Sequence, residues 1–221
     1  MIPLRALLTR YSTPIVTLVI ILANTAIFLY EWVQPYYSRN MFIEHYGLVP
    51  DRLHLSMLVT SMFLHGGWLH LIGNMWFLWV FGSHIEDAVG AVKYAILYLL
   101  CGTAAAIVQV YAMAGSPVPT IGASGAIAGI MGAFLLLYPR VRITTLIFLF
   151  VFIMTIDVPA ALMLIYWFAI QLLSGFASYR SFSIAGGVAW FAHVGGFIAG
   201  LLLVRLFYHH TRQRYYKRYH P

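Results

Sequence analysis

Residues 122–133 read Gly-Ala-Ser-Gly-Ala-Ile-Ala-Gly-Ile-Met-Gly-Ala, an apolar stretch whose one hydroxyl belongs to Ser124. Its small residues recur at helical spacing, and the GxxxG motif that starts at Gly125 allows two membrane helices to approach closely. A second stretch has the same character, because His193 precedes another GxxxG motif that starts at Gly196. Close packing of these two helices would bring the serine hydroxyl and the imidazole together, as a nucleophile and its base.

The composition is that of a membrane protein. The chain has 221 residues, of which 62% are hydrophobic and 9% charged, whereas a soluble domain carries about 25% charged residues. We expect a single membrane domain over residues 1–221. The formal net charge of +7 lies between apolar segments and in the C-terminal tail, so membrane topology explains it and we expect no nucleic-acid partner.

Six segments are long and apolar enough to cross a bilayer, which requires about 20 residues per helix. The sequence therefore predicts an all-α membrane protein, a six-transmembrane-helix bundle with a long first outer loop at residues 34–67. The predicted spans are 14–33, 68–87, 92–113, 121–138, 159–178 and 188–207.

A further apolar segment, residues 143–156, is short for a span and suits an interfacial or re-entrant position. With six spans and a cytoplasmic N-terminus, ten of the 13 Lys and Arg residues fall inside, as the positive-inside rule requires. A seventh span would put Ser124 and His193 at opposite faces. We therefore expect both termini in the cytoplasm and a basic cytoplasmic tail at 208–221.

Polar residues also enter the second predicted helix, where His70 and Asn74 share one face at i and i+4. Both lie at the outer side, as Ser124 does, so they are candidate donors to a developing oxyanion. The alternative is that they bridge helices or hold the first loop. His65 lies outside that face, and we expect a structural role for it.

We expect neither a metal nor a cofactor. Three imidazoles, those of His65, His70 and His193, are available, but the sequence has no H-E-x-x-H motif, no cysteine pair and no carboxylate near them. Cys101 is the only cysteine, and its position inside a predicted helix indicates packing.

The carboxylates lie far from the predicted Ser–His pair. Glu86 and Asp87 fall at the opposite end of the second helix, about 18 Å from Asn74 by helical rise, and Glu86 is expected to tie helix ends together. The stretch Asp157-Val158-Pro159 has the pattern of a helix start. A serine enzyme built on this chain would therefore use a Ser–His dyad, whose third, orienting group is not visible in the sequence.

The chain resembles the rhomboid intramembrane serine proteases. The resemblance rests on the opening Ile2-Pro3-Leu4, the six spans, His70-x-x-x-Asn74, the GxSG motif and Ala192-His193-x-x-Gly196. It implies that Ser124 is the nucleophile and His193 the general base. It further implies an oxyanion hole formed by His70, Asn74 and the Ser124 backbone N–H, with four structural residues nearby. These four are His65, Gly122, Gly125 and Gly196.

The same resemblance implies the activity. Members of the family cleave transmembrane segments of other membrane proteins near the outer face, with small residues before the cut. Substrate would enter beside the second and fifth helices, under a cap at Ser181 to Gly187. The partners would be transmembrane substrates and the lipid bilayer, and the location a prokaryotic plasma or inner membrane.

Two alternatives belong to other functional classes. A catalytically inactive rhomboid-like scaffold would bind membrane helices without cutting them. A transporter would need internal repeats and a midplane site, and the sequence shows neither. One departure concerns the first loop, where many relatives carry Trp-Arg and this chain has Leu55-Ser56-Met57-Leu58, which leaves the anchoring of that loop open.

Overall fold

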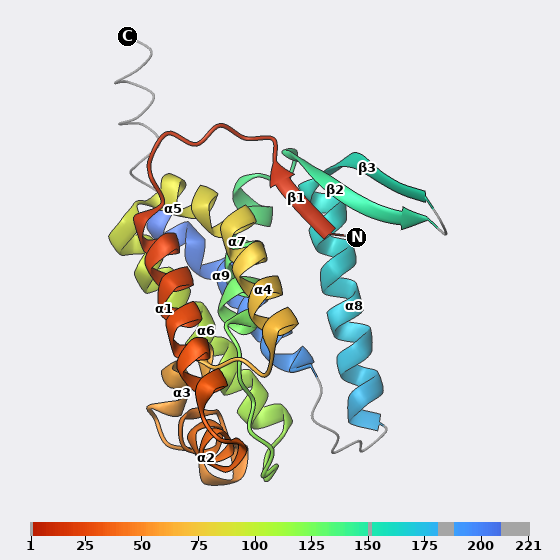
Figure 1. Cartoon of the computed structure of the whole chain (residues 1–221). Coiled ribbons are helices and arrows are strands. Elements are labelled where there is room, and N and C mark those ends of the chain that lie inside the picture. Colours follow the sequence, from red (N-terminus) through yellow and green to blue (C-terminus); the bar gives the residue numbers. More distant parts are fainter. Residues whose placement is uncertain (1, 150–151, 181–187, 209–221) are drawn as a thin grey trace.

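The computed structural model describes residues 2–149, 152–180 and 188–208, which form a helical bundle with a small sheet at one end (Figure 1). The helices are α1 (Ile15–Val33), α2 (Tyr36–Tyr46), α3 (Met57–Thr60), α4 (Trp68–Phe77), α5 (Ser83–Val89), α6 (Ala91–Ala112), α7 (Ser124–Leu137), α8 (Ala160–Arg180) and α9 (Trp190–Tyr208). Three short turns are η1 (Pro50–Arg52), η2 (Ser61–Phe63) and the π-helical η3 (Leu78–Gly82). The strands are β1 (Ile2–Ala6), β2 (Arg142–Leu149) and β3 (Phe152–Pro159).

The predicted helical membrane bundle is confirmed. In the described part of the chain, four helices are long and apolar enough to cross a membrane, namely α1, α6, α8 and α9. The second predicted span is helical from Trp68 to Val89, with the π turn η3 between α4 and α5. The fourth is α7, an apolar helix of 14 residues. The count of six spans stays a prediction.

The mostly helical bundle also carries a small antiparallel sheet. Most of residues 143–156, expected to be interfacial or re-entrant, lies in the antiparallel strands β2 and β3, and the N-terminal β1 pairs with β2. The β-branched and aromatic residues of this stretch favour strands. Asp157 also differs from expectation: it lies on β3, where it accepts a hydrogen bond of 2.7 Å from the Thr144 hydroxyl, and α8 begins only at Ala160.

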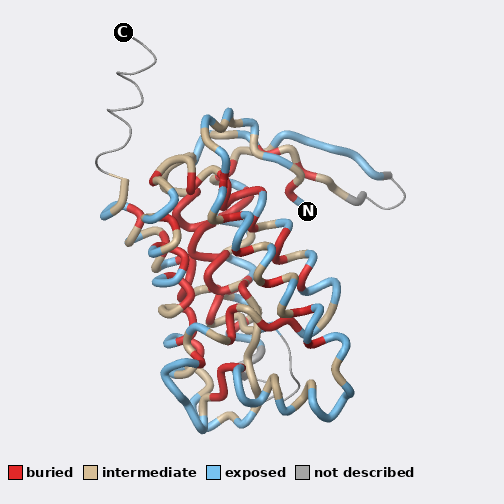
Figure 2. The backbone as a smooth tube through the Cα atoms, turned by 60° about the vertical axis from the view of Figure 1, so that its left-hand side comes forward, coloured by how far each residue is buried: buried red, intermediate tan, exposed pale blue. Residues whose placement is uncertain are grey.

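Helices α7 and α9 pack backbone against backbone through their glycines. A Cβ at Gly196 would overlap the carbonyl oxygen of Gly125, and one at Gly200 would overlap that of Gly129. Every residue of α7 from Gly125 to Phe134 is buried, and buried residues lie along the middle of the bundle (Figure 2). The two GxxxG motifs thus make the close approach that the sequence predicts.

The start of α1 is held by the end of α5. The Glu86 carboxylate accepts hydrogen bonds of 2.8 Å from the backbone N–H groups of Val16 and Thr17, and one of 2.7 Å from the Thr17 hydroxyl. The first N–H groups of a helix have no partner within it, so this carboxylate caps α1 from a distant part of the chain. The prediction that Glu86 ties helix ends together is confirmed.

The first loop is anchored without a Trp-Arg pair at residues 55–58. Arg39, on α2, donates a hydrogen bond of 3.3 Å to the carbonyl oxygen of Gly66 and lies over the Trp32 ring at 5.1 Å. Further along, Leu48 and Thr120 exchange two backbone hydrogen bonds of 2.9 and 2.8 Å. The loop is thereby joined to both segments that lead into the candidate site.

Candidate active site

Ser124 and His193 lie within hydrogen-bond distance. Ser124 is the first residue of α7, and His193 lies one turn into α9. The Ser124 Oγ is 2.7 Å from the His193 Nε2. His193 is buried, with 8% of its surface exposed, whereas Ser124 is only partly buried. The glycine contacts between α7 and α9 explain how an imidazole and a hydroxyl that are far apart in sequence lie next to each other.

The second nitrogen of the imidazole has a partner that the sequence did not reveal. The His193 Nδ1 is 2.7 Å from the Oε1 of Gln171, a buried residue of α8. An amide oxygen only accepts hydrogen bonds, so Nδ1 carries the proton in the neutral ring. The Nε2 lone pair then faces the Ser124 hydroxyl. The Gln171 amide nitrogen donates to the carbonyl oxygen of Trp167 at 3.4 Å, which agrees with this orientation of the amide.

Sequence reasoning missed Gln171, although one signal was present. It is the only amide side chain of the apolar run 160–177, and a polar residue inside a membrane helix is a functional candidate by default.

Aromatic rings and a second glutamine further restrict His193. The Trp167 ring centroid lies 5.7 Å from that of the imidazole, at an interplanar angle of 35°. On the other side, the Gln109 side chain on α6 accepts a hydrogen bond of 3.2 Å from the backbone N–H of Ala192. The imidazole is therefore held by contacts from α7 and α8, and the adjacent backbone of α9 by a contact from α6.

The turn before Ser124 requires a glycine. Gly122 has φ of +125°, a conformation that L side chains rarely adopt. A Cβ there would also lie 2.7 Å from the His70 Nε2 and 3.8 Å from the Asn74 Nδ2. His70 and Asn74 therefore flank the backbone two residues before Ser124, as their shared helical face predicts.

Three hydrogen-bond donors lie around this turn. The Asn74 amide nitrogen is buried and has no hydrogen-bond partner within the described residues. His70 is exposed, and its Nδ1 accepts a long bond of 3.4 Å from the Gly66 N–H, so its neutral ring carries the proton on Nε2. The backbone N–H of Ser124 begins α7 and has no partner in that helix.

His65 lies beside this cluster rather than within it. Its ring is fully buried and its centroid is 5.1 Å from that of His70. Burial, together with the neighbouring imidazole of His70, lowers the pKa of His65 to about 3. The ring is therefore neutral at physiological pH.

No three His, Cys, Asp or Glu side chains gather where they could hold a metal ion, within residues 2–149, 152–180 and 188–208. Two expected features fall outside these ranges. They are the cap at 181–187 and nearly all of the basic tail, which is described only at Tyr208.

Comparisons with known proteins agree with this architecture. The family model of the Rhomboid domain matches residues 52–210, a range that includes every residue of the candidate site. The chain is 30% identical over 153 residues to "RHOMBOID-like protein 6, mitochondrial" of Arabidopsis thaliana, covering 66% of this chain and 41% of that protein.

Two further relatives come from an animal and a bacterium. "Presenilin-associated rhomboid-like protein, mitochondrial" of Mus musculus is 32% identical over 139 residues, 62% of this chain and 36% of that protein. "Rhomboid protease GluP" of Bacillus subtilis is 38% identical over 78 residues, 35% of this chain and 15% of that protein. The chain thus spans less than half the length of these curated relatives.

Proposed function

Because the chain belongs to the rhomboid family, we propose that it is an intramembrane serine endopeptidase that cuts transmembrane segments of other membrane proteins near the outer face. The observation that carries the proposal is the bond of 2.7 Å between the Ser124 Oγ and the His193 Nε2. A serine hydroxyl next to an imidazole whose other nitrogen is held by an acceptor is the arrangement of a nucleophile and its general base. One relative is itself named a rhomboid protease.

In the first step of this mechanism, the Ser124 Oγ attacks the carbonyl carbon of the scissile peptide bond. His193 takes the hydroxyl proton on Nε2 and becomes an imidazolium. Gln171 holds the Nδ1 proton throughout, so the ring presents its basic nitrogen to the serine before the reaction. Gln171 is a positioning residue, because it acts on the substrate only through His193.

The oxyanion of the tetrahedral intermediate needs donors that are already in place. We assign this role to His70 Nε2–H, Asn74 Nδ2–H and the backbone N–H of Ser124. The Asn74 amide supports the assignment because it is buried with no hydrogen-bond partner in the described chain. A buried donor without an acceptor costs about 1–3 kcal/mol, and a substrate oxygen would remove that cost.

Completion of the reaction returns the proton to the substrate. The imidazolium of His193 protonates the leaving amine as the peptide C–N bond breaks, which leaves an acyl ester on Ser124. Water then attacks the ester with His193 again as base, and the product acid and free serine are released.

Substrate selection follows from the chemistry of a helical peptide bond. Its carbonyl is hydrogen-bonded within the helix and shielded, so cleavage requires local unwinding. We therefore expect substrates with Gly, Pro or polar residues near the cut and small residues before it. Entry beside α4 and α8, under the segment 181–187, is the route that the family resemblance implies.

The membrane location is part of the proposal. We infer six spans and cytoplasmic termini, supported by the ten Lys and Arg residues that this topology places inside. The prokaryotic plasma or inner membrane is proposed from the family resemblance alone. Accessibility of single introduced cysteines to an impermeant reagent in whole cells tests it. Labelling of the C-terminal tail from outside would overturn the orientation.

The decisive experiment uses purified protein in liposomes with a single-span model substrate. Wild type should cleave it and react with a fluorophosphonate probe, whereas Ser124→Ala should do neither and His193→Ala should lose cleavage. Ser174→Ala, a matched serine variant on α8, should retain both activities. Cleavage by Ser124→Ala would refute the protease proposal. Absence of cleavage and of labelling in the folded wild type would favour the inactive scaffold.

A further inference from the structure

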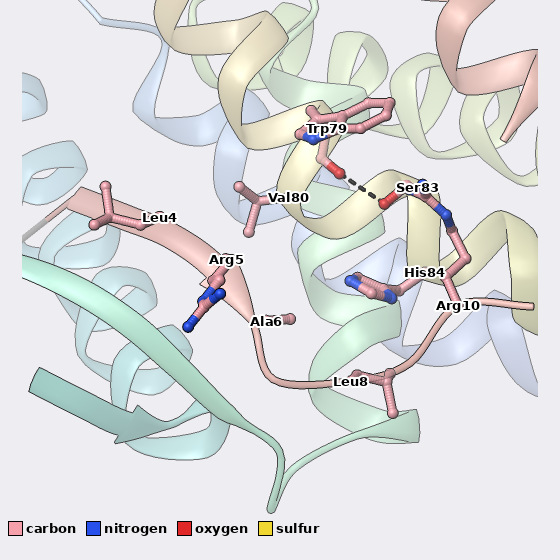
Figure 3. Close-up of a pocket in the computed structure, with 9 residues that line it drawn as sticks. All are labelled: Leu4, Arg5, Ala6, Leu8, Arg10, Trp79, Val80, Ser83 and His84. Atoms are coloured by element: carbon pink, nitrogen blue, oxygen red, sulfur yellow. Dashed lines mark hydrogen bonds between the residues drawn. The ribbon is translucent and has the colours of Figure 1, made fainter. Parts of the chain in front are cut away.

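A polar cavity lies beside the α5 end of the continuous helix α4–η3–α5, and Figure 3 shows the residues that line it. Its volume is about 370 Å³, and it lies between the N-terminal segment and the η3–α5 junction. His84 lies ten residues beyond Asn74 in this helix, which is about 15 Å by helical rise. The cavity is therefore separate from the candidate active site.

Two arginines without an anionic partner line this cavity. Arg5 and Arg10 both belong to the N-terminal segment, and within the described ranges the only ion pair joins Arg52 to Glu44. The Arg10 guanidinium lies over the Trp79 ring at 5.1 Å. The neighbouring Asp87 already accepts hydrogen bonds from the backbone N–H groups of Tyr11 and Ser12, at 3.1 and 2.8 Å.

On the α5 side of the cavity, the imidazole of His84 has a ring nitrogen without a hydrogen-bond partner in the described chain. This nitrogen, Nδ1, is buried, and the ring projects from α5 toward the N-terminal segment (Figure 3). The adjacent Ser83 hydroxyl already donates to the Trp79 carbonyl oxygen at 2.8 Å. In Figure 3 the Arg10 guanidinium lies beside Ser83, on the same side of the cavity as His84, whereas Arg5 lies on the opposite side. An anion near Arg10 and His84 would therefore also feel the positive charge of Arg5 across the cavity.

Apolar side chains line the same cavity. Leu4, Leu8 and Val80 lie beside the cationic groups, and the Trp79 side chain is exposed, as is typical of aromatic residues at a membrane interface. A free inorganic anion would make no favourable contact with these apolar side chains. A phospholipid has both a phosphate for the cationic groups and acyl chains for the apolar ones.

We propose that this cavity binds an anionic phospholipid, with its phosphate group near Arg10 and His84, Arg5 adding positive charge from the opposite side, and its acyl chains against Leu4 and Leu8. A bound headgroup would join the N-terminal segment to α5, two parts of the chain that are far apart in sequence. Basic pockets between membrane helices and their flanking segments bind such headgroups. A free phosphate ion carries the same anionic group as a phospholipid, so the experiment compares the two ligands.

The test is native mass spectrometry of the detergent-solubilised full chain, titrated with phosphatidylglycerol, phosphatidylcholine or inorganic phosphate. Wild type should retain one phosphatidylglycerol in preference to phosphatidylcholine. Each arginine removed should weaken retention about fivefold, the factor expected for a cation near anionic lipid. The double variant Arg5→Gln/Arg10→Gln should therefore lose about 25-fold in apparent affinity.

Arg140→Gln is the matched control, because Arg140 is an exposed arginine that does not line the cavity. It should bind lipid as wild type does, and fluorophosphonate labelling of Ser124 should show that all variants are folded. If Arg140→Gln and Arg10→Gln weakened lipid retention equally, retention would depend only on the general surface charge, and the proposed site would be overturned. Displacement of the lipid by millimolar inorganic phosphate would overturn the lipid as the ligand.

Discussion

Replacement of Gln171 by methionine should lower kcat about 10- to 100-fold and leave KM nearly unchanged. The methionine side chain has a similar volume but no amide oxygen, so the Nδ1–H of His193 would lose the acceptor that now lies at 2.7 Å. Both side chains are buried, with 8% of His193 and 5% of Gln171 exposed. An unsatisfied buried donor costs about 1–3 kcal/mol.

The imidazole can avoid that cost by moving its proton to Nε2. In that tautomer the nitrogen that faces the Ser124 hydroxyl is a donor and can no longer act as a base. Each 1.4 kcal/mol is a tenfold change in population, which gives the expected range for kcat. KM should stay nearly unchanged because Gln171 contacts the His193 Nδ1, the ring nitrogen that is turned away from Ser124.

The assay is cleavage of a single-span substrate in liposomes, with kcat and KM determined separately. Gln171→Glu keeps an acceptor oxygen and should recover most of the rate. Gln109→Met is a matched control, because it removes another buried amide next to His193 that bonds the backbone rather than the ring. A folded Gln171→Met enzyme with kcat within twofold of wild type would refute the assigned role, as would an equal loss in Gln109→Met.

Three further outcomes are expected. Asn74→Ala should lower kcat about 10²- to 10³-fold, the effect of removing one oxyanion donor, while cooperative thermal unfolding shows that the protein is folded; an unchanged kcat would remove Asn74 from the oxyanion hole. Gly200→Ala should lower thermal stability because the new Cβ would overlap the carbonyl oxygen of Gly129, whereas Gly73→Ala has open space and should be neutral or stabilising. Glu86→Gln should lower the melting temperature by weakening the charge-assisted cap of α1, and an unchanged value would show that the cap contributes nothing.

The contact between Ser124 and His193 could be predicted from the sequence because the information is local. Glycines at i and i+4 mark the face of each helix that can approach another, and both reactive residues are adjacent to those glycines. Membrane helices need small residues for such an approach, so few other pairings of α7 and α9 were available.

Gln171 could not be assigned in the same way. Its helix is apolar on all sides, so the pattern does not reveal which face turns toward α9. The rotation of α8 is set by packing against the rest of the bundle, for example by the stacking of Phe168 on Phe197 at 4.6 Å. Tertiary contacts of this kind leave no periodic signal in the sequence.

The sheet was missed for a related reason. A short apolar run is equally consistent with an interfacial helix and with paired strands, and periodicity alone does not separate them. The deciding partner is β1, whose Ile2 pairs with Leu146 from a distant part of the chain. Likewise, α7 starts at Ser124 rather than at residue 121 because the positive φ of Gly122 is not helical.

The length of α7 has a consequence for water. Its 14 residues rise about 21 Å, some 9 Å less than the hydrocarbon thickness of a bilayer. Non-helical chain at membrane depth is tolerated only where protein buries it or where it lines an aqueous space. In the non-helical segment 113–123, Thr120 exchanges backbone hydrogen bonds with Leu48, and the Gly122 N–H donates to the Ser61 carbonyl oxygen at 2.9 Å. The short helix would leave Ser124 below the outer edge of the hydrocarbon, with loop rather than helix above it, so under the proposed function the hydrolytic water would reach the serine past this loop.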